Sequence, residues 1–556
     1  MKRYKVKSIL TILVVLVLSS CSNNLNEELY DRIGKENYYQ NKNAILASLL
    51  RTYEHGHWYA ANERWYAQEL TSDHFTWTQK GRHGYDGGQW VRLHNHTWTA
   101  EENVLASCWN GGFSGIGYAN NSMADIETLD YSKFGMTDAE KQTHIAELKT
   151  IRSWYQLMLL DFFGSIPIVE NISDLKPQST PQENFTWIEK EIKENIDKLP
   201  KAPIAKYEGR MTQGAAATLL VRLYLNSQAY IGATKWTEAA QVCQDILDGK
   251  YGTYSIDPTW YGPFNATNDK SPEAIWYFPH AKNQLDGSFY YAPFFHYNTD
   301  QATGFTQWGE WNGVHLQPSL DLDGNPYPFA LGNPFAKFNS KDLRKKPFNY
   351  LGSGKYEGMF MYGPQFKRGT TEPILATEEY NGEPLIFVDQ VGRFSEKPSG
   401  RWAEGSHVIT GEENSGVRWM KYPVFPDNDP NEMEPDGAEM RLTEIVYALA
   451  ECKFRLGDNA AAATLLNSVR IRNFSAEDWT TLAYTADQIT EQELLNEWGR
   501  EFLGERRRRT DLIRFGKFTE GTWWDKEATP ANKKFFPIPN KALNTNPLLK
   551  PTEANN

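Results

Sequence analysis

The chain has 556 residues, of which 40% are hydrophobic and 23% are charged, and its net charge at pH 7 is −12. This length supports a large hydrophobic core or two to three lobes. The acidic balance argues against nucleic acid as a partner, because surfaces that bind phosphate backbones are basic. Apart from Cys21, the three cysteines are too widely spaced to predict a disulfide framework. Cys243 and Cys452 fall within apolar helical patterns, where we expect small core side chains.

Residues 1–20 have the pattern of a secretory signal peptide. A basic start precedes the apolar run 9–18, which is too short to cross a bilayer as a helix, and two serines follow. Cys21 comes directly after them and resembles the cysteine of a bacterial lipobox, whose thiol receives a diacylglycerol and becomes the mature N-terminus. The alternative is an ordinary signal peptide followed by an accidental cysteine. Cleavage removes four positive charges and no negative ones, which takes the net charge from −12 to −16. The polar residues 21–40 predict a lipidated tether.

Amphipathic helices are predicted where apolar residues recur every three or four positions, over residues 147–163, 187–199, 212–226 and 235–248. Gly164 follows the first of these and predicts its end. The last two form a helical hairpin of about 37 residues, a length close to that of a tetratricopeptide unit. Their alanines allow the two helices to pack closely.

Residues 441–472 repeat this hairpin design, and a further helix is predicted from Thr490, with Glu493 completing a capping box. Repeats of this kind stack into a scaffold. Five tryptophans fall on helical core stripes and are assigned to packing: Trp109, Trp154, Trp187, Trp236 and Trp498.

Residues 50–120 and 255–435 lack long periodic runs and are rich in Gly, Pro, Asn and aromatic residues. Loops of this length are usually functional. Five tryptophans between residues 58 and 98 show no helical period, which argues against a core stripe. We therefore expect a mainly α fold, in which a tetratricopeptide-like helical-repeat scaffold carries a loop-rich, aromatic-rich ligand-binding lobe.

The chain resembles the SusD/RagB family of outer-membrane nutrient-binding lipoproteins over nearly its whole mature length. In the first two thirds the resemblance lies in Trp109, Ile116 and Asn120, in the segments 151–167 and 209–225, and in Asp342-Leu343-Arg344. In the last third it lies in Arg441 with Ala450-Glu451, in Asn467 to Arg472, in Glu497, Glu501, Glu505, Arg508, Asp511, Leu512 and Arg514, and in Phe536 to Pro539 with Asn546-Pro547. The sequence departs from the family's motifs at Trp498, at Arg506 and at residues 548–551. These positions lie in scaffold motifs, so the departures affect the expected local packing.

The resemblance implies a SusD-like domain over residues 41–556, with an N-terminal part (41–250) and a C-terminal part (251–556). It also implies a surface-exposed lipoprotein of the outer membrane. Its partner would be a SusC-like TonB-dependent transporter, over which such proteins act as a hinged lid. The usual ligands are oligosaccharides and sometimes peptides.

Saccharide rings stack their C–H faces on aromatic rings, and their hydroxyls need directional polar partners. Two stretches of this sequence supply both kinds of residue. The candidate ligand-binding residues are Asp73, Trp77, Arg82, Tyr85 and Trp90 in the first stretch, and Tyr297, Asn298, Trp308, Trp311 and Asn312 in the second.

Three motifs suggest other chemistry, and each has a simpler interpretation. His55-x-His57 and His94-x-His96 could ligate a metal, but no cysteine or carboxylate completes a known spacing, so no metal site is predicted. Residues 321–325 resemble part of a calcium loop without its bidentate glutamate, and a turn is favoured. The run 506–509 is interpreted as helical and ion-paired with the glutamates beside it.

The leading hypothesis is oligosaccharide capture for a transporter, without catalysis and without a cofactor. One alternative is a glycoside hydrolase, which needs two carboxyl groups roughly 5 Å or 6.5–9.5 Å apart. The sequence alone selects no such pair, and it contains no serine-nucleophile or zinc-protease motif. The other alternative is a peptide-binding module built on the helical repeats.

Overall fold

The computed structural model describes residues 35–171, 175–202, 209–280, 293–305, 310–392, 405–426 and 435–555. The expected signal peptide, Cys21 and Trp308 lie outside these residues. The folded part begins before residue 41, because helix α2 (Lys35–Tyr38) leads into Tyr39, which is buried. No helix in this part of the chain is both long enough and apolar enough to span a membrane.

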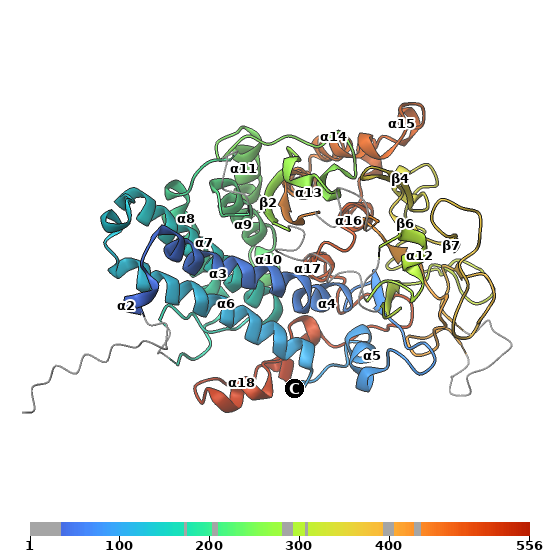
Figure 1. The fold of residues 1–556 in the computed structure, drawn as a ribbon, viewed down its shortest axis with the longest axis horizontal. Helices are drawn as coiled ribbons and strands as arrows, with labels where there is room; N and C mark the ends of the chain where they lie inside the picture. Colours follow the sequence, from blue (N-terminus) through green and yellow to red (C-terminus); the bar gives the residue numbers. More distant parts are fainter. Residues whose placement is uncertain are drawn as a thin grey trace, which may run out of the picture.

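The scaffold is built from helices that pack against one another largely in chain order (Figure 1). Its first part contains α3 (Lys42–Ala61), α4 (Glu63–Glu69), α6 (Asn103–Thr128), α7 (Asp138–Phe163), α8 (Pro181–Asn195), α9 (Gln213–Leu225), α10 (Ser227–Ile231) and α11 (Trp236–Leu247). Its second part contains α13 (Leu442–Arg455), α14 (Asn459–Arg470), α15 (Ala476–Leu482), α16 (Glu491–Glu501), α17 (Arg508–Arg514) and α18 (Asn540–Thr545). Helix α6 packs on α7, α7 on α8, α9 on α11, α11 on α13, and α13 on α14. The predicted mainly α fold with a helical-repeat scaffold is therefore confirmed.

Local signals in the sequence set several of the helix ends. Helix α7 ends at Gly164, as predicted, where the backbone has a φ of 69°. Thr212 caps α9 and Thr490 caps α16 through the amides three residues on. Helix α8 begins six residues before the predicted start, because Thr180 and Glu183 form a reciprocal capping box ahead of the apolar stripe.

The prediction that residues 50–120 are loop-rich is wrong, because α3, α4 and α6 cover most of this stretch. The glycines that suggested loops allow close helix packing instead. A Cβ added at Gly112 would lie 2.7 Å from Leu159, and one at Gly115 would lie 2.2 Å from Tyr155. Trp65 and Trp98, which were expected outside the core, are each 1% exposed.

Residues 255–435 form a loop-rich lobe, as predicted, in which the described strands and helices are short. Its segments are joined by short antiparallel strand pairs: β1 (Phe75–Trp77) with β3 (Val314–Leu316), β2 (Ala274–Phe278) with β10 (Gly437–Arg441), β4 (Asn349–Gly352) with β5 (Lys355–Glu357), β6 (Phe360–Met361) with β9 (Arg418–Trp419), and β7 (Gly363–Pro364) with β8 (Ile386–Phe387). The short helices α5 (Gln89–His94) and α12 (Thr299–Thr303) lie on the same side of the molecule as β4, β6 and β7 (Figure 1).

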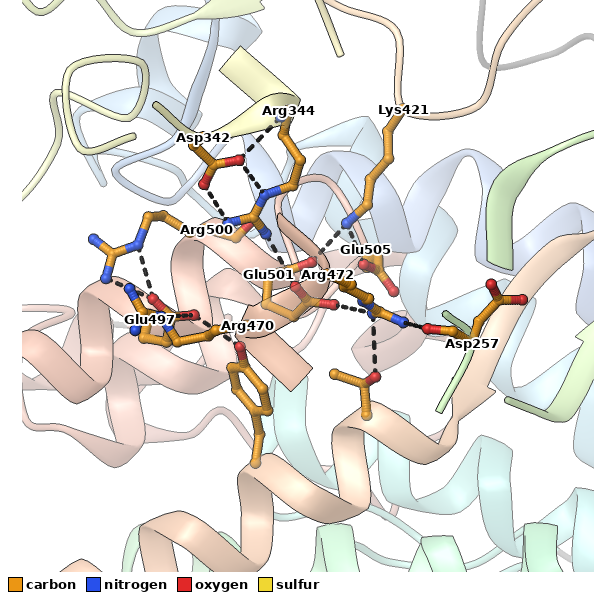
Figure 2. A network of polar contacts seen from close by, with 12 residues as sticks. Asp257, Asp342, Arg344, Lys421, Arg470, Arg472, Glu497, Arg500, Glu501 and Glu505 are labelled. Carbon is orange, nitrogen blue, oxygen red and sulfur yellow. Dashed lines mark hydrogen bonds and ion pairs between the residues drawn. The ribbon is translucent and has the colours of Figure 1, made fainter. Parts of the chain in front are cut away.

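A buried ionic network joins this lobe to the scaffold (Figure 2). At its centre the carboxylate of Glu501, on α16, contacts Arg441 at 2.9 Å, Arg472 at 2.9 Å and Arg344 at 3.0 Å. Arg344 comes from the lobe, whereas Arg441 precedes α13 and Arg472 follows α14. Although burial alone raises a carboxyl pKa, these guanidinium groups hold the pKa of Glu501 well below its usual range. Glu501 is therefore an ionised structural anchor rather than an acid–base catalyst.

The four consecutive arginines 506–509 are ion-paired, but not with the glutamates beside them as the sequence suggested. Arg506 has a φ of 59° and breaks the helical path between α16 and α17. The arginines reach across the molecule instead: Arg506 to Glu439, Arg507 to Glu444, Arg508 to Asp73 and Arg509 to Asp161.

The histidine and aspartate motifs have structural partners. Ring nitrogens of His55, His94 and His96 lie 2.8, 3.2 and 2.7 Å from backbone carbonyl oxygens. No cluster of three or more His, Cys, Asp or Glu side chains arranged to hold a metal occurs in the described ranges. The Asp321 carboxylate accepts hydrogen bonds from the backbone amides of Asp323 and Asn325, which makes this segment the predicted turn.

Candidate aromatic binding site

The candidate site is built on two parallel tryptophan rings. Trp77 ends strand β1 opposite Val314, and Trp90 lies on helix α5. The ring centroids are 4.2 Å apart, the planes differ by 4°, and each side chain is 6% exposed. A glycine at position 313 makes room for this stack, since a Cβ there would lie 2.4 Å from the Trp77 ring. The pair is therefore a rigid platform, and little of it reaches solvent.

One hydrogen bond and a third aromatic ring hold the platform in place. The indole nitrogen of Trp90 donates to the Asp86 carboxylate at 2.6 Å. Tyr66, on α4, packs edge-on against both tryptophans, with centroids 5.4 Å from Trp90 and 6.1 Å from Trp77. Because α4 belongs to the scaffold, the platform is fixed to the rigid part of the molecule.

One exposed aromatic ring contacts the platform, and a second lies at the start of helix α5, which carries Trp90. Trp311 is 53% exposed, and its ring lies 6.1 Å from Trp77 at an angle of 34°. Tyr85 is 50% exposed, and its ring end lies close to Gly88, at the start of α5. Exposed rings of this kind, backed by buried ones, offer faces on which the C–H groups of a saccharide can stack.

Polar side chains border the aromatic rings. The ring of His83 meets that of Tyr297 at 6.1 Å and its Nε2 lies 3.6 Å from the Glu378 carboxylate. Arg82 is exposed, and its Nε donates to His83. Asn298 donates to the carbonyl oxygen of Leu375 at 2.8 Å. Burial, followed by the nearby glutamates, raises the pKa of Tyr297 to about 12, so its hydroxyl stays protonated at neutral pH.

The two stretches selected from the sequence therefore meet in space, through Trp77 with Trp311 and through His83 with Tyr297. That juxtaposition could not be read from the sequence, because more than 200 positions separate the two stretches. His83 and Tyr66 were not selected. Tyr66 lies in α4, where the sequence pattern suggested a loop and therefore predicted no helical face for this side chain.

Two of the selected residues are buried and already paired. The Asp73 carboxylate, which is 0% exposed, binds Arg508 and accepts from the amide of Gly332 at 2.9 Å. Burial raises its pKa, but the Arg508 guanidinium outweighs that effect and holds the pKa of Asp73 well below its usual range. Asp73 is a structural tie between β1 and α17, with no exposed surface for a ligand.

Asn312 is a buried residue beneath the exposed Trp311, and its hydrogen bonds fix the backbone at this position. It is 2% exposed, accepts from Arg418 at 2.6 Å and donates to the carbonyl oxygen of Glu413 at 2.9 Å. Its backbone has a φ of 49°, a left-handed conformation that asparagine tolerates better than most residues. This local turn directs the chain from the exposed Trp311 into strand β3.

A buried lysine fixes the same turn. The Lys80 ammonium donates to the carbonyl oxygen of Gly313 and to the hydroxyl of Thr78, both at 2.9 Å. Burial holds the pKa of Lys80 well below its usual range. The segment that carries Trp311 is therefore tied to the strand that carries Trp77, which keeps the two rings together.

The carboxylate of Glu413, whose own backbone carbonyl accepts from Asn312, is fully engaged. It is 1% exposed and accepts from the backbone amides of Thr377, Glu378 and Tyr380 and from the ring of His296. A carboxylate held by four donors is poorly suited to exchange protons with a substrate. The arrangement offers stacking and hydrogen bonding.

Comparison with known proteins points to one family. Residues 272–554 match the sequence model of the SusD family, and residues 25–225 match the model described as "Starch-binding associating with outer membrane". The starch-binding protein SusD of Bacteroides thetaiotaomicron is 27% identical over 445 residues, which cover 75% of this chain and 74% of that protein.

Solved structures share the fold. Surface glycan-binding protein A from Bacteroides uniformis has a TM-score of 0.63 and 18% identity, covering 92% of this chain and 99% of that one. Surface glycan-binding protein A from B. thetaiotaomicron in complex with laminarihexaose has a TM-score of 0.63 and 16% identity, covering 92% of this chain and 100% of that one.

Proposed function

We propose that this chain, which belongs to the SusD family, captures oligosaccharides at the cell surface and delivers them to a TonB-dependent transporter of the outer membrane. The observation that carries the proposal is the exposed ring of Trp311 beside the buried Trp77–Trp90 stack. The similar proteins support a glycan as the ligand, since one is a starch-binding protein and another is bound to laminarihexaose.

The charges around the site favour neutral glycans over anionic ones. Asp86, Glu310 and Glu378 all lie near the aromatic rings in sequence or in space. Of the cations beside them, Arg82 is exposed, and Arg92 is paired with Glu102. Uronic acids and sulfated sugars would be repelled by these carboxylates and by the net charge of −12. We therefore expect neutral oligosaccharides to bind best.

The test is calorimetric titration of the soluble form that starts after Cys21. Plant, microbial and host oligosaccharides would be titrated in neutral and anionic sets, and the release of reducing ends would be followed in the same samples. Binding of a neutral oligosaccharide without release is the expected result. Release of product would make the protein a glycoside hydrolase, and absence of binding across the set would remove the basis of the proposal.

The anchor and the transporter require cellular tests. Replacing Cys21 with Ala is expected to abolish incorporation of a labelled fatty acid and to release the protein from the membrane fraction. Affinity purification of the lipidated protein from outer membranes is expected to recover a barrel-sized TonB-dependent protein. Recovery of the protein alone under mild detergent would contradict the proposed partnership.

A further inference from the structure

A second cavity lies on the helical scaffold, formed by α6, α7 and α8. Its volume is about 590 Å³, within the range of pockets that hold small ligands. Its lining includes Asn120 from α6, Lys149 and Arg152 from α7, and Trp187 and Glu191 from α8. None of these residues belongs to the aromatic site described above, so the cavity is a separate feature of the fold.

The floor of this cavity has buried polar atoms that lack hydrogen-bond partners. Arg152 is 3% exposed; it donates to Asn120 at 2.7 Å and pairs with Glu191 at 3.0 Å. Its Nε, however, has no hydrogen-bond partner among the described residues. Glu191 Oε1 has none there either, and its ion-pair contact is the Lys149 ammonium at 3.9 Å. A buried polar atom left without a partner costs about 1–3 kcal/mol. Both residues line the cavity, so the hydroxyl groups of a ligand bound there would lie beside this donor and this acceptor.

One wall of the cavity is aromatic. The Arg152 guanidinium lies 5.2 Å from the centre of the Trp187 ring, and the indole nitrogen of Trp187 lies 3.3 Å from the carboxylate of Glu170. These contacts fix the orientation of the ring. The sequence pattern had assigned Trp187 to core packing, but its side chain is only partly buried, and it lines the cavity.

The charged side chains that line the cavity favour neutral ligands over anionic ones. The cavity is lined by the cations Lys149, Arg152 and Lys190 and by the carboxylates Glu127, Glu170, Glu191 and Glu194. This set has no excess of positive charge, which disfavours phosphates and other anions. An aromatic wall with alternating donors and acceptors matches the faces and hydroxyls of a neutral sugar.

We infer that this scaffold cavity is a second saccharide site, which takes one or two units of a neutral glycan independently of the aromatic site. Two sites on one protein would let a long glycan bind at both and dissociate more slowly than a short one. A glycan too short to bridge the sites gains no such advantage.

Fluorine NMR of protein labelled with 5-fluorotryptophan would test the inference. Substituting Trp187→Phe and Trp311→Phe would identify the resonances of these two residues. The probes would be maltose, cellobiose, laminaribiose and the corresponding hexasaccharides, with trialanine as a peptide probe. We expect the Trp187 resonance to shift with at least one saccharide, and to shift equally in a Trp311→Ala variant.

A matched pair of variants on α8 separates ligand contact from helix stability. Glu191→Gln removes the charge from the cavity floor and is expected to weaken the Trp187 response at least fivefold. Glu189→Gln changes the same helix at a position paired with Tyr224 and Lys193, outside the cavity lining, and is expected to leave the response unchanged. Equal effects of both variants would overturn the inference.

The two proposals fail in different ways. A fixed Trp187 resonance with a moving Trp311 resonance would overturn the second site and support the aromatic site. A shift of the Trp187 resonance without a shift of the Trp311 resonance would support the second site and overturn the aromatic site. A Trp187 response to trialanine alone would make the cavity a peptide site and overturn the inference.

Discussion

The ionic network around Glu501 and the aromatic site around Trp311 use polar and aromatic residues in opposite ways. In the network, side chains that prefer water are buried, and Glu501 is only 4% exposed. In the aromatic site, a side chain that prefers the core is more than half exposed. The buried charges bond mainly to one another, and Arg472 Nε is the atom of these four side chains left without a hydrogen-bond partner among the described residues, whereas the exposed ring keeps a free face. A residue with unused bonding capacity is therefore a better guide to ligand binding than residue type.

Removing the centre of the network should have the largest effect. Glu501→Ala would leave Arg441, Arg472 and Arg344 buried without their shared carboxylate. Breaking a buried ion pair from one side costs about 3–5 kcal/mol. We expect the free energy of unfolding, measured by urea denaturation, to fall by at least this amount.

A surface pair provides the control for this substitution. Glu372 pairs with Lys367 and has a side chain that is 61% exposed. Glu372→Ala should change the free energy of unfolding by less than about 1 kcal/mol. Similar losses from Glu501→Ala and Glu372→Ala would mean that the network does not hold the lobe to the scaffold.

Acid should weaken the scaffold without changing the tryptophan rings of the aromatic site, which do not titrate. Burial raises the pKa of Glu497, but the guanidinium groups of Arg500 and Arg470 outweigh it and lower the pKa to about 2. A carboxyl whose folded pKa lies below its unfolded value of 4.5 stabilises the fold above pH 4.5. That stability is lost as the pH falls from 4.5 toward 2, and for Glu497 it is on the order of 3 kcal/mol.

Urea denaturation between pH 2 and pH 7 measures this loss. The wild-type protein should lose stability steeply below pH 4.5, and a Glu497→Gln variant should lose less over the same interval. Glu357→Gln, at an exposed pair with Lys346, should keep the wild-type slope. If the free energy of unfolding fell equally with pH in wild type and in Glu497→Gln, the loss of stability in acid could not be attributed to Glu497.

The two regions also differ in how far the sequence predicts them. Helices such as α9 and α13 follow from apolar periodicity, because their buried stripes recur every three or four residues. Apolar periodicity did not delimit helix α6, although Trp109 was placed on a helical core stripe, because glycines occupy the contacts of this helix with Leu159 and Tyr155 and so weaken the apolar stripe. Periodicity detects helices that bury large side chains, and it fails where backbones approach closely.

The sequence predicted which two stretches contribute to the candidate site, but not which of their side chains face solvent. Trp311 and Tyr85 are exposed, as a binding role requires, yet Asp73 and Asn312 in the same stretches are buried and paired with residues remote in sequence. Whether a polar residue faces a ligand or an arginine from another helix depends on tertiary contacts. No local pattern in the sequence distinguishes the two cases, and for that reason Trp187 was assigned to the core as well.

The smallest expected effect on the fold belongs to Trp311. Trp311→Ala removes a ring that is 53% exposed, so the free energy of unfolding should change by less than about 1 kcal/mol. Trp58, on α3, is 54% exposed, and the contacts described for the aromatic site do not include it, so Trp58→Ala is a matched control. Both variants should unfold at nearly the same urea concentration as wild type.

Their affinities for the best neutral oligosaccharide should differ. Loss of an aromatic anchor at the centre of a binding surface typically costs about 2 kcal/mol, which corresponds to roughly thirtyfold weaker binding. We expect this loss for Trp311→Ala and none for Trp58→Ala in the same calorimetric titration. Equal affinities of the two variants would mean that exposure alone does not mark the binding ring. In that case the ligand would contact the protein elsewhere, and the scaffold cavity beside Trp187 would be the next surface to test, because there the unused bonding capacity belongs to buried groups rather than to an exposed ring.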